Sequence, residues 1–263
     1  MANLRTVLDS LTLEGDGLAT DAPDGWTQGR TLYGGLTAAL SVQAALLKHA
    51  DLPPPRSGLF TFAGPASGRL TFTPTLLRQG RAAAVVSVDA VGDSGFAARS
   101  VLTFGAARES QVAHDHRLGV TPARPAACEA FFLDGQPGRS FFQNFEMRIA
   151  GGGRPLSGDI DDGVGFDVWV RHLDDAGVDP AISLLALADS LPPAAMVVFP
   201  NPAPISTMTW MVDFAQPVAA GTWRYVRSYS EAAADGYSHQ AMEVYDDEGR
   251  RIAVGRQTMA IFV

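Results

Sequence analysis

The pattern of apolar and polar positions passes through one series of elements in each half of the chain. In the first half, apolar residues recur on a helical period after paired glycines, which predicts a helix from Gly35 to His49. Four strand-like segments separated by Gly-containing turns then follow, at residues 58–64, 68–80, 81–92 and 96–105.

The second half repeats this order. Extended segments at 140–150 and 164–172 precede an apolar run that predicts a helix, with Pro180 near its start and Pro192 and Pro193 at its end. Four more strand-like segments follow, at 203–215, 221–232, 236–246 and 250–263. Each half therefore reads as a helix wrapped by an antiparallel sheet, which is an α+β fold.

The same order of elements in both halves indicates an internal duplication, although the two halves share little sequence. We expect a first module at residues 1–108 and a second module at 138–263. The segment 109–137 is rich in Pro, Gly and charge and has no sustained period, as is typical of a linker.

Composition narrows the function classes. The 28 acidic residues exceed the 20 basic ones and give a net charge of −8, which argues against a nucleic-acid partner because phosphate binding needs a basic face. No apolar stretch is long enough to predict a membrane span. The single cysteine, Cys128, excludes an internal disulfide and fits a reducing cytoplasm. The apolar fraction of 46% against 18% charged residues favours self-association into a homo-oligomer.

One acid stands out. The run LLALADSLPPA, residues 184–194, places Asp189 inside an otherwise apolar helix-like stretch, where a carboxylate is costly unless other groups satisfy it. We therefore expect polar groups from other parts of the chain to form hydrogen bonds with Asp189. A structural role, in which Asp189 caps nearby backbone, is the alternative to a chemical one.

Several motifs in this order resemble the double-hotdog acyl-CoA thioesterases of the TesB type. They are YGGLTAAL, LLRQGR, LLALADSLPPA, ISTMTW and DGYSHQAMEVYDDEGRRIAVGRQTMAIF, and they cover most of the chain. The resemblance implies two fused hotdog modules and hydrolysis of acyl-CoA without a metal or cofactor. In that family the second module contributes an Asp on its helix, a Thr or Ser on the next strand and a Gln on the last strand. The matching positions here are Asp189, Thr207 and Gln257, with Ser206 as a second source of the hydroxyl.

These residue types suit a hydrolytic site. A carboxylate only accepts hydrogen bonds, whereas a hydroxyl and an amide also donate, so together they can orient a water that Asp189 deprotonates. Gly34 and Gly35 open the first predicted helix and can offer backbone N–H groups to the polarised carbonyl, or they can simply give a tight helix entry. The corresponding first-module helix carries no acid, so we expect one site per chain.

Arg78 and Arg81 are candidates to bind the phosphates of coenzyme A, with ordinary surface charge as the alternative. Two rival functions stay open at this point. One is a protein that binds acyl-CoA or another apolar ligand without turning it over. The other is a hotdog hydratase or dehydratase, which would need an Asp and a His close together.

Overall fold

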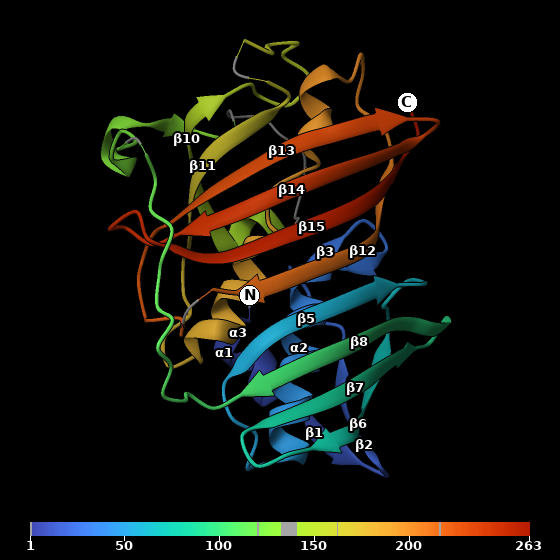
Figure 1. Cartoon of the computed structure of the whole chain (residues 1–263). Coiled ribbons are helices and arrows are strands. Elements are labelled where there is room, and N and C mark those ends of the chain that lie inside the picture. The colour runs from blue at the N-terminus through green and yellow to red at the C-terminus, as the bar shows by residue number, and fades with distance from the viewer. Residues whose placement is uncertain (1, 120, 133–140, 162, 216) are drawn as a thin grey trace.

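A computed structural model describes residues 2–119, 121–132, 141–161, 163–215 and 217–263. Its main feature is one antiparallel sheet of 13 strands in the order β1-β2-β6-β7-β8-β5-β12-β15-β14-β13-β11-β10-β9 (Figure 1). A separate two-stranded ribbon is formed by β3 (Thr27–Gln28) and β4 (Thr31–Leu32). The sheet wraps around two main helices, one from each half, as the double-hotdog expectation requires.

The first half supplies one end of this sheet. Its strands are β1 (Thr12–Glu14), β2 (Gly17–Asp21), β5 (Pro55–Phe62), β6 (Arg69–Gln79), β7 (Ala83–Gly92) and β8 (Gly95–Gly105). A short helix α1 (Leu4–Asp9), which the hydrophobic pattern did not predict, precedes them. The predicted central helix is present as α2 (Gly34–Lys48), one residue earlier at each end than expected.

The second half supplies the other end. Its strands are β9 (Glu129–Ala130), β10 (Phe145–Gly152), β11 (Gly165–His172), β12 (Ile205–Phe214), β13 (Arg224–Ala234), β14 (Tyr237–Tyr245) and β15 (Arg251–Ile261). Short 3₁₀ turns are η1 (Pro125–Ala127), η2 (Phe141–Asn144) and η3 (Ala194–Val198). The central helix α3 (Pro180–Ala188) begins at a proline whose preceding Asp179 accepts from the backbone N–H groups of Ala181 and Ile182.

Strands β5 and β12 join the two halves into one sheet. They pair antiparallel, with Trp210 opposite Phe60, and the two rings lie 5.4 Å apart. Because backbone hydrogen bonds cross this junction, neither half exposes a free central strand edge there. The two halves therefore share one sheet.

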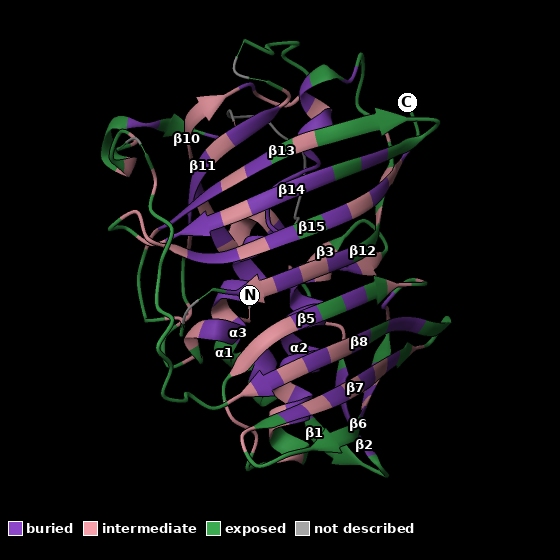
Figure 2. Ribbon diagram, viewed as in Figure 1, coloured by how far each residue is buried: buried purple, intermediate pink, exposed green. Residues whose placement is uncertain are grey.

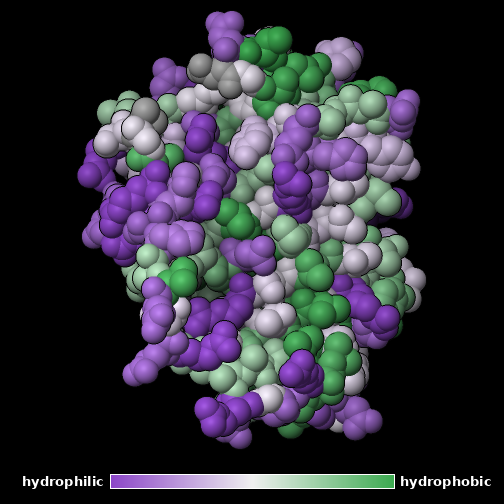
Figure 3. All heavy atoms as spheres, viewed as in Figure 1, coloured by the Kyte–Doolittle hydropathy of each residue, from purple (hydrophilic) through white to green (hydrophobic). Residues whose placement is uncertain are grey.

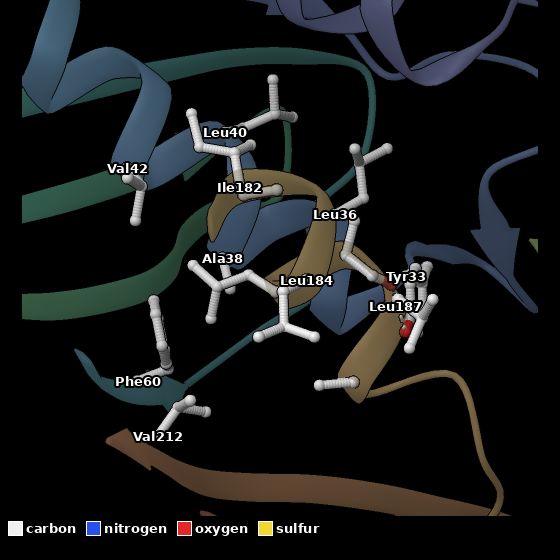
Figure 4. Packing of buried hydrophobic residues seen from close by; sticks show 14 of the residues in the cluster. Tyr33, Leu36, Ala38, Leu40, Val42, Phe60, Ile182, Leu184, Leu187 and Val212 are labelled. Carbon is white, nitrogen blue, oxygen red and sulfur yellow. Dashed lines mark hydrogen bonds between the residues drawn. The ribbon is translucent and has the colours of Figure 1, made fainter. Parts of the chain in front are cut away.

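The helices α2 and α3 pack against each other behind this junction (Figure 4). Leu36 and Leu40 of α2 lie near Ile182 and Leu184 of α3, and all four belong to one apolar core that draws on both halves. The phenol of buried Tyr33 also donates a 2.9 Å hydrogen bond to the Ala186 carbonyl. This contact fixes the start of α2 against the last turn of α3, which is where the candidate site lies.

The predicted linker, residues 109–137, lies partly outside the described residues, at 120 and 133–137. Its described part contains β9, whose residues Glu129 and Ala130 pair with β10. Arg117 also forms an isolated bridge with Arg250 in the second half. The module boundaries stay a prediction.

Burial alternates along the strands, as expected for a sheet with one covered face (Figure 2). On the outer face several large apolar side chains are exposed, among them Leu59 on β5 and Phe96 on β8, and Figure 3 shows apolar groups beside strongly polar ones there. Self-association into a homo-oligomer stays a prediction. Within the described ranges, no helix is long and apolar enough to cross a membrane.

Candidate active site

Asp189 lies at the C-terminal end of α3, where it is the C-cap residue rather than a residue within the helix. Helix α3 ends at Ala188, four residues before the first of the two prolines that were expected to end it. The partly buried Asp189 side chain lines two neighbouring cavities of about 360 and 430 Å³. The carboxyl group therefore meets both cavities at the point where they adjoin.

The two cavities differ in chemistry. The first, here called the polar cavity, is lined by hydroxyl, amide and guanidinium groups together with small residues, including Gln28, Arg30, Thr31, Thr37 and Ser206. The second, here called the apolar cavity, is lined mainly by aromatic, proline and thioether side chains, including Phe132, Phe141, Phe142, Pro193, Met196 and Met259. Gln28, Asp189, Ile205 and Thr207 line both cavities.

Gln257 reaches Asp189 from β15. It is only 3% exposed, and its Nε2 donates a 2.5 Å hydrogen bond to Asp189 Oδ1. A carboxylate is tolerated at the end of this apolar helix because a buried amide from β15 pairs with it. The structure thus brings together two of the three residues that the resemblance implies for the second module, in direct contact.

The surroundings of Asp189 change its acidity. Burial raises the pKa of this carboxyl from its ordinary 3.8 to about 7, and the hydrogen bonds from Gln257 and the Gly35 backbone N–H offset part of that rise. A carboxyl with a pKa near 7 is ionised in a large fraction of molecules at neutral pH, yet it is basic enough to accept a proton. A perturbed carboxyl at a cavity wall is typical of a functional group.

Gly34 lets the carboxylate approach the start of α2. A Cβ atom at this position would lie 2.7 Å from Asp189 Oδ2 and 3.3 Å from Cζ of Phe62, so no larger residue fits without displacement. The N-cap residue, Tyr33, offers no side-chain acceptor to the first N–H groups of the helix. The N-terminus of α2, with its partial positive charge, therefore faces Asp189 and the polar cavity.

A β-bulge decides which hydroxyl faces the cavities. From Trp210 onward, alternate residues of β12 are buried, and continuing that alternation would turn Ser206 inward. The register with β15 shifts between Thr207 and Thr209, so Met208 is an extra residue and lies 41% exposed. Thr207 is consequently half-buried and lines both cavities, whereas Ser206 is exposed and lines the polar cavity only.

Arg78 and Arg81 are not brought to the cavities. They lie at the end of β6 and in the turn before β7, in register with the Thr103 end of β8, whereas Ala97 at the other end of β8 lines the polar cavity. The basic residue that does line the polar cavity is the exposed Arg30. The sequence pattern does not single out Arg30, because this residue lies in a short turn between β3 and β4 that has no recognisable period.

A second buried glutamine was also missed. Gln240 on β14 lies directly opposite Gln257, is 1% exposed, and donates from Nε2 to Gln257 Oε1. The sequence does carry a signal for Gln240. It alternates with Ser238 and Met242 along β14, so it falls on the buried face of that strand.

Neither cavity has a histidine among its described lining residues. Over the same described ranges, no three His, Cys, Asp or Glu side chains group together in a way that could hold a metal ion. The polar groups around Asp189 are therefore hydroxyls, amides, backbone N–H groups and one guanidinium.

Comparison with solved structures shows the fold. A conserved protein of unknown function with a hot dog fold from Alicyclobacillus acidocaldarius is 21% identical, with a TM-score of 0.85 over 100% of this chain and 99% of that chain. A putative thioesterase II from Thermobifida fusca YX is 18% identical, with a TM-score of 0.81 over 100% and 98% of the two chains. A putative thioesterase from Novosphingobium aromaticivorans DSM 12444 is 24% identical, with a TM-score of 0.79 over 97% and 99%.

Comparison with curated proteins gives no match. Two family models match the sequence, however, one for each half. The acyl-CoA thioesterase N-terminal domain matches residues 22–105, and the acyl-CoA thioesterase C-terminal domain matches residues 125–261. Since these matches cover most of the chain in the order of the fold, the protein belongs to the acyl-CoA thioesterase family and has its double-hotdog architecture.

Proposed function

We propose that this thioesterase hydrolyses acyl-CoA with Asp189 as the general base. The observation that carries the proposal is the Asp189 carboxyl itself, which lies where two cavities meet, is paired with Gln257, and has a pKa raised to about 7. A water between the Asp189 carboxylate and the Thr207 hydroxyl would be deprotonated by Asp189 as its oxygen attacks the thioester carbonyl carbon.

The N-terminus of α2 supports the next step. The carbonyl oxygen becomes an oxyanion in the tetrahedral intermediate, and we assign its stabilisation to the backbone N–H of Gly34, while the N–H of Gly35 holds the Asp189 carboxylate. Because both residues lack a Cβ atom, the substrate can approach this backbone closely. Collapse of the intermediate breaks the C–S bond and releases a thiolate. The proton that Asp189 took from water then passes to this thiolate, so the products are a free acid and a thiol.

The two cavities suggest how the substrate lies. The apolar cavity fits the acyl group because its walls are aromatic, proline and thioether side chains. The polar cavity fits the thiol-bearing arm of coenzyme A, and we assign to Arg30, which lines this cavity, the contact with the anionic part of that arm. The thioester carbonyl then falls at the junction of the cavities, beside Asp189.

Thiol release from a panel of acyl-CoAs tests this function. We expect hydrolysis of octanoyl-CoA with kcat/KM at least ~100-fold above that of acetyl-CoA, since each methylene that enters the apolar cavity contributes about 0.8 kcal/mol. Free thiol is followed colorimetrically at pH 8. No thiol release from any chain length would rule out hydrolysis, and raised thermal stability in the presence of the same acyl-CoAs would then favour a binding protein.

The hydratase alternative is less well supported by the site. Such an enzyme needs an Asp and a His acting together, and the described walls of both cavities contain Asp189 but no His. The dehydratase domain of RzxB from Pseudomonas fluorescens does share the fold, with a TM-score of 0.60 at 13% identity. A shared fold does not imply a shared reaction.

The choice between Thr207 and Ser206 has a direct test. We expect Thr207→Ala to lower kcat about 10- to 100-fold, because only Thr207 is turned by the bulge toward both cavities, where it can orient the water. The neighbouring Ser206→Ala is the matched control and should stay within about 2-fold of wild type. If Ser206→Ala produces the larger loss, Ser206 supplies the hydroxyl instead.

A further inference from the structure

Four groups form one buried chain of hydrogen bonds behind Asp189. The Ala194 backbone N–H donates to Gln240 Oε1 at 2.8 Å. Gln240 Nε2 donates to Gln257 Oε1, and Gln257 Nε2 donates to Asp189 Oδ1, each at 2.5 Å. The chain therefore runs from the backbone at the start of η3 across β14 and β15 to the proposed catalytic carboxylate.

The two ends of this chain fix its direction. A backbone N–H only donates, and an ionised carboxylate only accepts. A glutamine amide can do both, so by itself it could point either way. With a donor held at Ala194, Gln240 must present its oxygen there and its NH2 to Gln257. Gln257 must then turn its oxygen toward Gln240 and its NH2 toward Asp189.

The sequence also determines which backbone N–H begins this series of hydrogen bonds. Pro192 and Pro193 have no N–H, so Ala194 is the first residue after Leu191 that can donate. Ala194 begins η3, where its N–H is free of a turn partner and available to Gln240. The two prolines therefore leave the Ala194 N–H as the first backbone donor after Leu191, and Gln240 accepts from it.

We infer that Gln240 is a positioning residue, which holds the Gln257 amide so that its NH2 group faces Asp189. Gln240 lines neither cavity and is linked to Asp189 through Gln257. Without it, the Gln257 amide loses the partner of its oxygen and is free to turn that oxygen toward the carboxylate. The reversed amide repels the ionised carboxylate and no longer donates to it. This role rests on the proposed function of Asp189.

The test compares Gln240→Met with Ser238→Ala. Methionine keeps the approximate volume but neither donates nor accepts in this chain. Ser238 is the matched control, because it lies on the same strand and the same face, is 0% exposed, and its hydroxyl has no hydrogen-bond partner among the described residues. The Asp189 carboxyl is titrated by ¹³C NMR in wild type and both variants, and kcat/KM is recorded against pH.

In Gln240→Met the midpoint of the Asp189 titration should rise by about one pH unit or more, the scale of one lost hydrogen bond to a charged group. The acidic limb of kcat/KM should move with it, while kcat falls about 10-fold and KM stays within 2-fold. Ser238→Ala should match wild type in all these measurements. Of the described residues, the other titratable or charged groups near Asp189 are Tyr33 at the start of α2 and Arg30 at the polar cavity, and both are unchanged in the variants.

An unchanged titration of Asp189 in Gln240→Met would overturn the inference, as would an equal change in Ser238→Ala. If the methionine variant does not fold, Gln240→Glu gives a second test. Its carboxylate can accept from Ala194 but cannot donate to Gln257, so the titration should again move upward. The NMR measurement separates this inference from the function: wild-type protein that releases no thiol disproves hydrolysis, whereas the Asp189 titration still tests the role of Gln240.

Discussion

Replacement of Asp189 by asparagine is expected to lower kcat by about 100- to 10,000-fold, the range for loss of a general base. Asparagine has the same shape and can still accept the hydrogen bond from Gln257 Nε2, so the fold should be retained. It cannot take a proton from water. Thiol release from octanoyl-CoA at saturating substrate measures the effect, and Asp51→Asn, at an exposed position after α2, is the matched control.

The same substitution has an expected effect on pH dependence. In wild type, kcat/KM should rise with pH and level off above about 7, because only the ionised form of Asp189 accepts a proton and its pKa is about 7. This pH dependence should be absent from the residual activity of Asp189→Asn. A wild-type profile that is flat between pH 5 and 9 would contradict a catalytic Asp189.

The stability contributed by Asp189 should fall as pH rises, whereas the activity should rise. Because the folded-state pKa of Asp189 is raised above its ordinary 3.8, its neutral form stabilises the fold at low pH, and this contribution is lost as pH rises through about 7. The asparagine amide in the variant carries no charge at any pH. The melting temperature of Asp189→Asn should therefore exceed that of wild type at pH 8, with a smaller difference at pH 4. An equal difference at both pH values would show that ionisation of Asp189 does not cost stability.

Gly34→Ala is expected to have the second largest effect, a loss of about 100-fold in kcat/KM. The added methyl group would lie 2.7 Å from Asp189 Oδ2, so the carboxylate must leave its place beside the start of α2 and lose its alignment with Gln257. The methyl group would also crowd the Gly34 N–H that is proposed to stabilise the oxyanion. Overpacking of this kind costs typically about 1–3 kcal/mol of stability as well.

Steady-state kinetics with octanoyl-CoA and a thermal melt measure both consequences of Gly34→Ala. The matched control is Gly119→Ala, since Gly119 is exposed and an added Cβ would meet nothing within 4 Å. Wild-type activity in Gly34→Ala would mean that the start of α2 does not take part in catalysis. A loss shared equally by Gly119→Ala would indicate a general effect of alanine in place of glycine.

The long strands of the fold could be read from the sequence because each has its own local signal. Strands β6, β7 and β8 are amphipathic runs bounded by glycine turns, and their ends lie within about two residues of the prediction. Helix α1 is only 6 residues long, too short for a periodic pattern to distinguish it. The exact end of α3 before Asp189 was also missed, because apolar residues continue past it.

The site was predictable only where residue type carried the information. Asp189 stands out as a lone acid in an apolar run, and the resemblance supplied its partner Gln257. The orientation of Thr207 depends on a bulge that one strand cannot reveal without its neighbour. Gln240 acts through a cross-strand pair, and pairing is a property of the sheet rather than of either strand. The Arg78 and Arg81 hypothesis rested on charge alone, which says nothing about distance.

The junction between β5 and β12 also has a consequence for the order of folding. Phe60 and Trp210, which face each other there, are about 150 residues apart along the chain, whereas β6, β7 and β8 pair as consecutive hairpins. Closing such a long loop is entropically costly, so contacts of this kind form late. The start of α2 and the end of α3 come from opposite sides of that junction. Hydrolytic activity should therefore return after most of the secondary structure has re-formed.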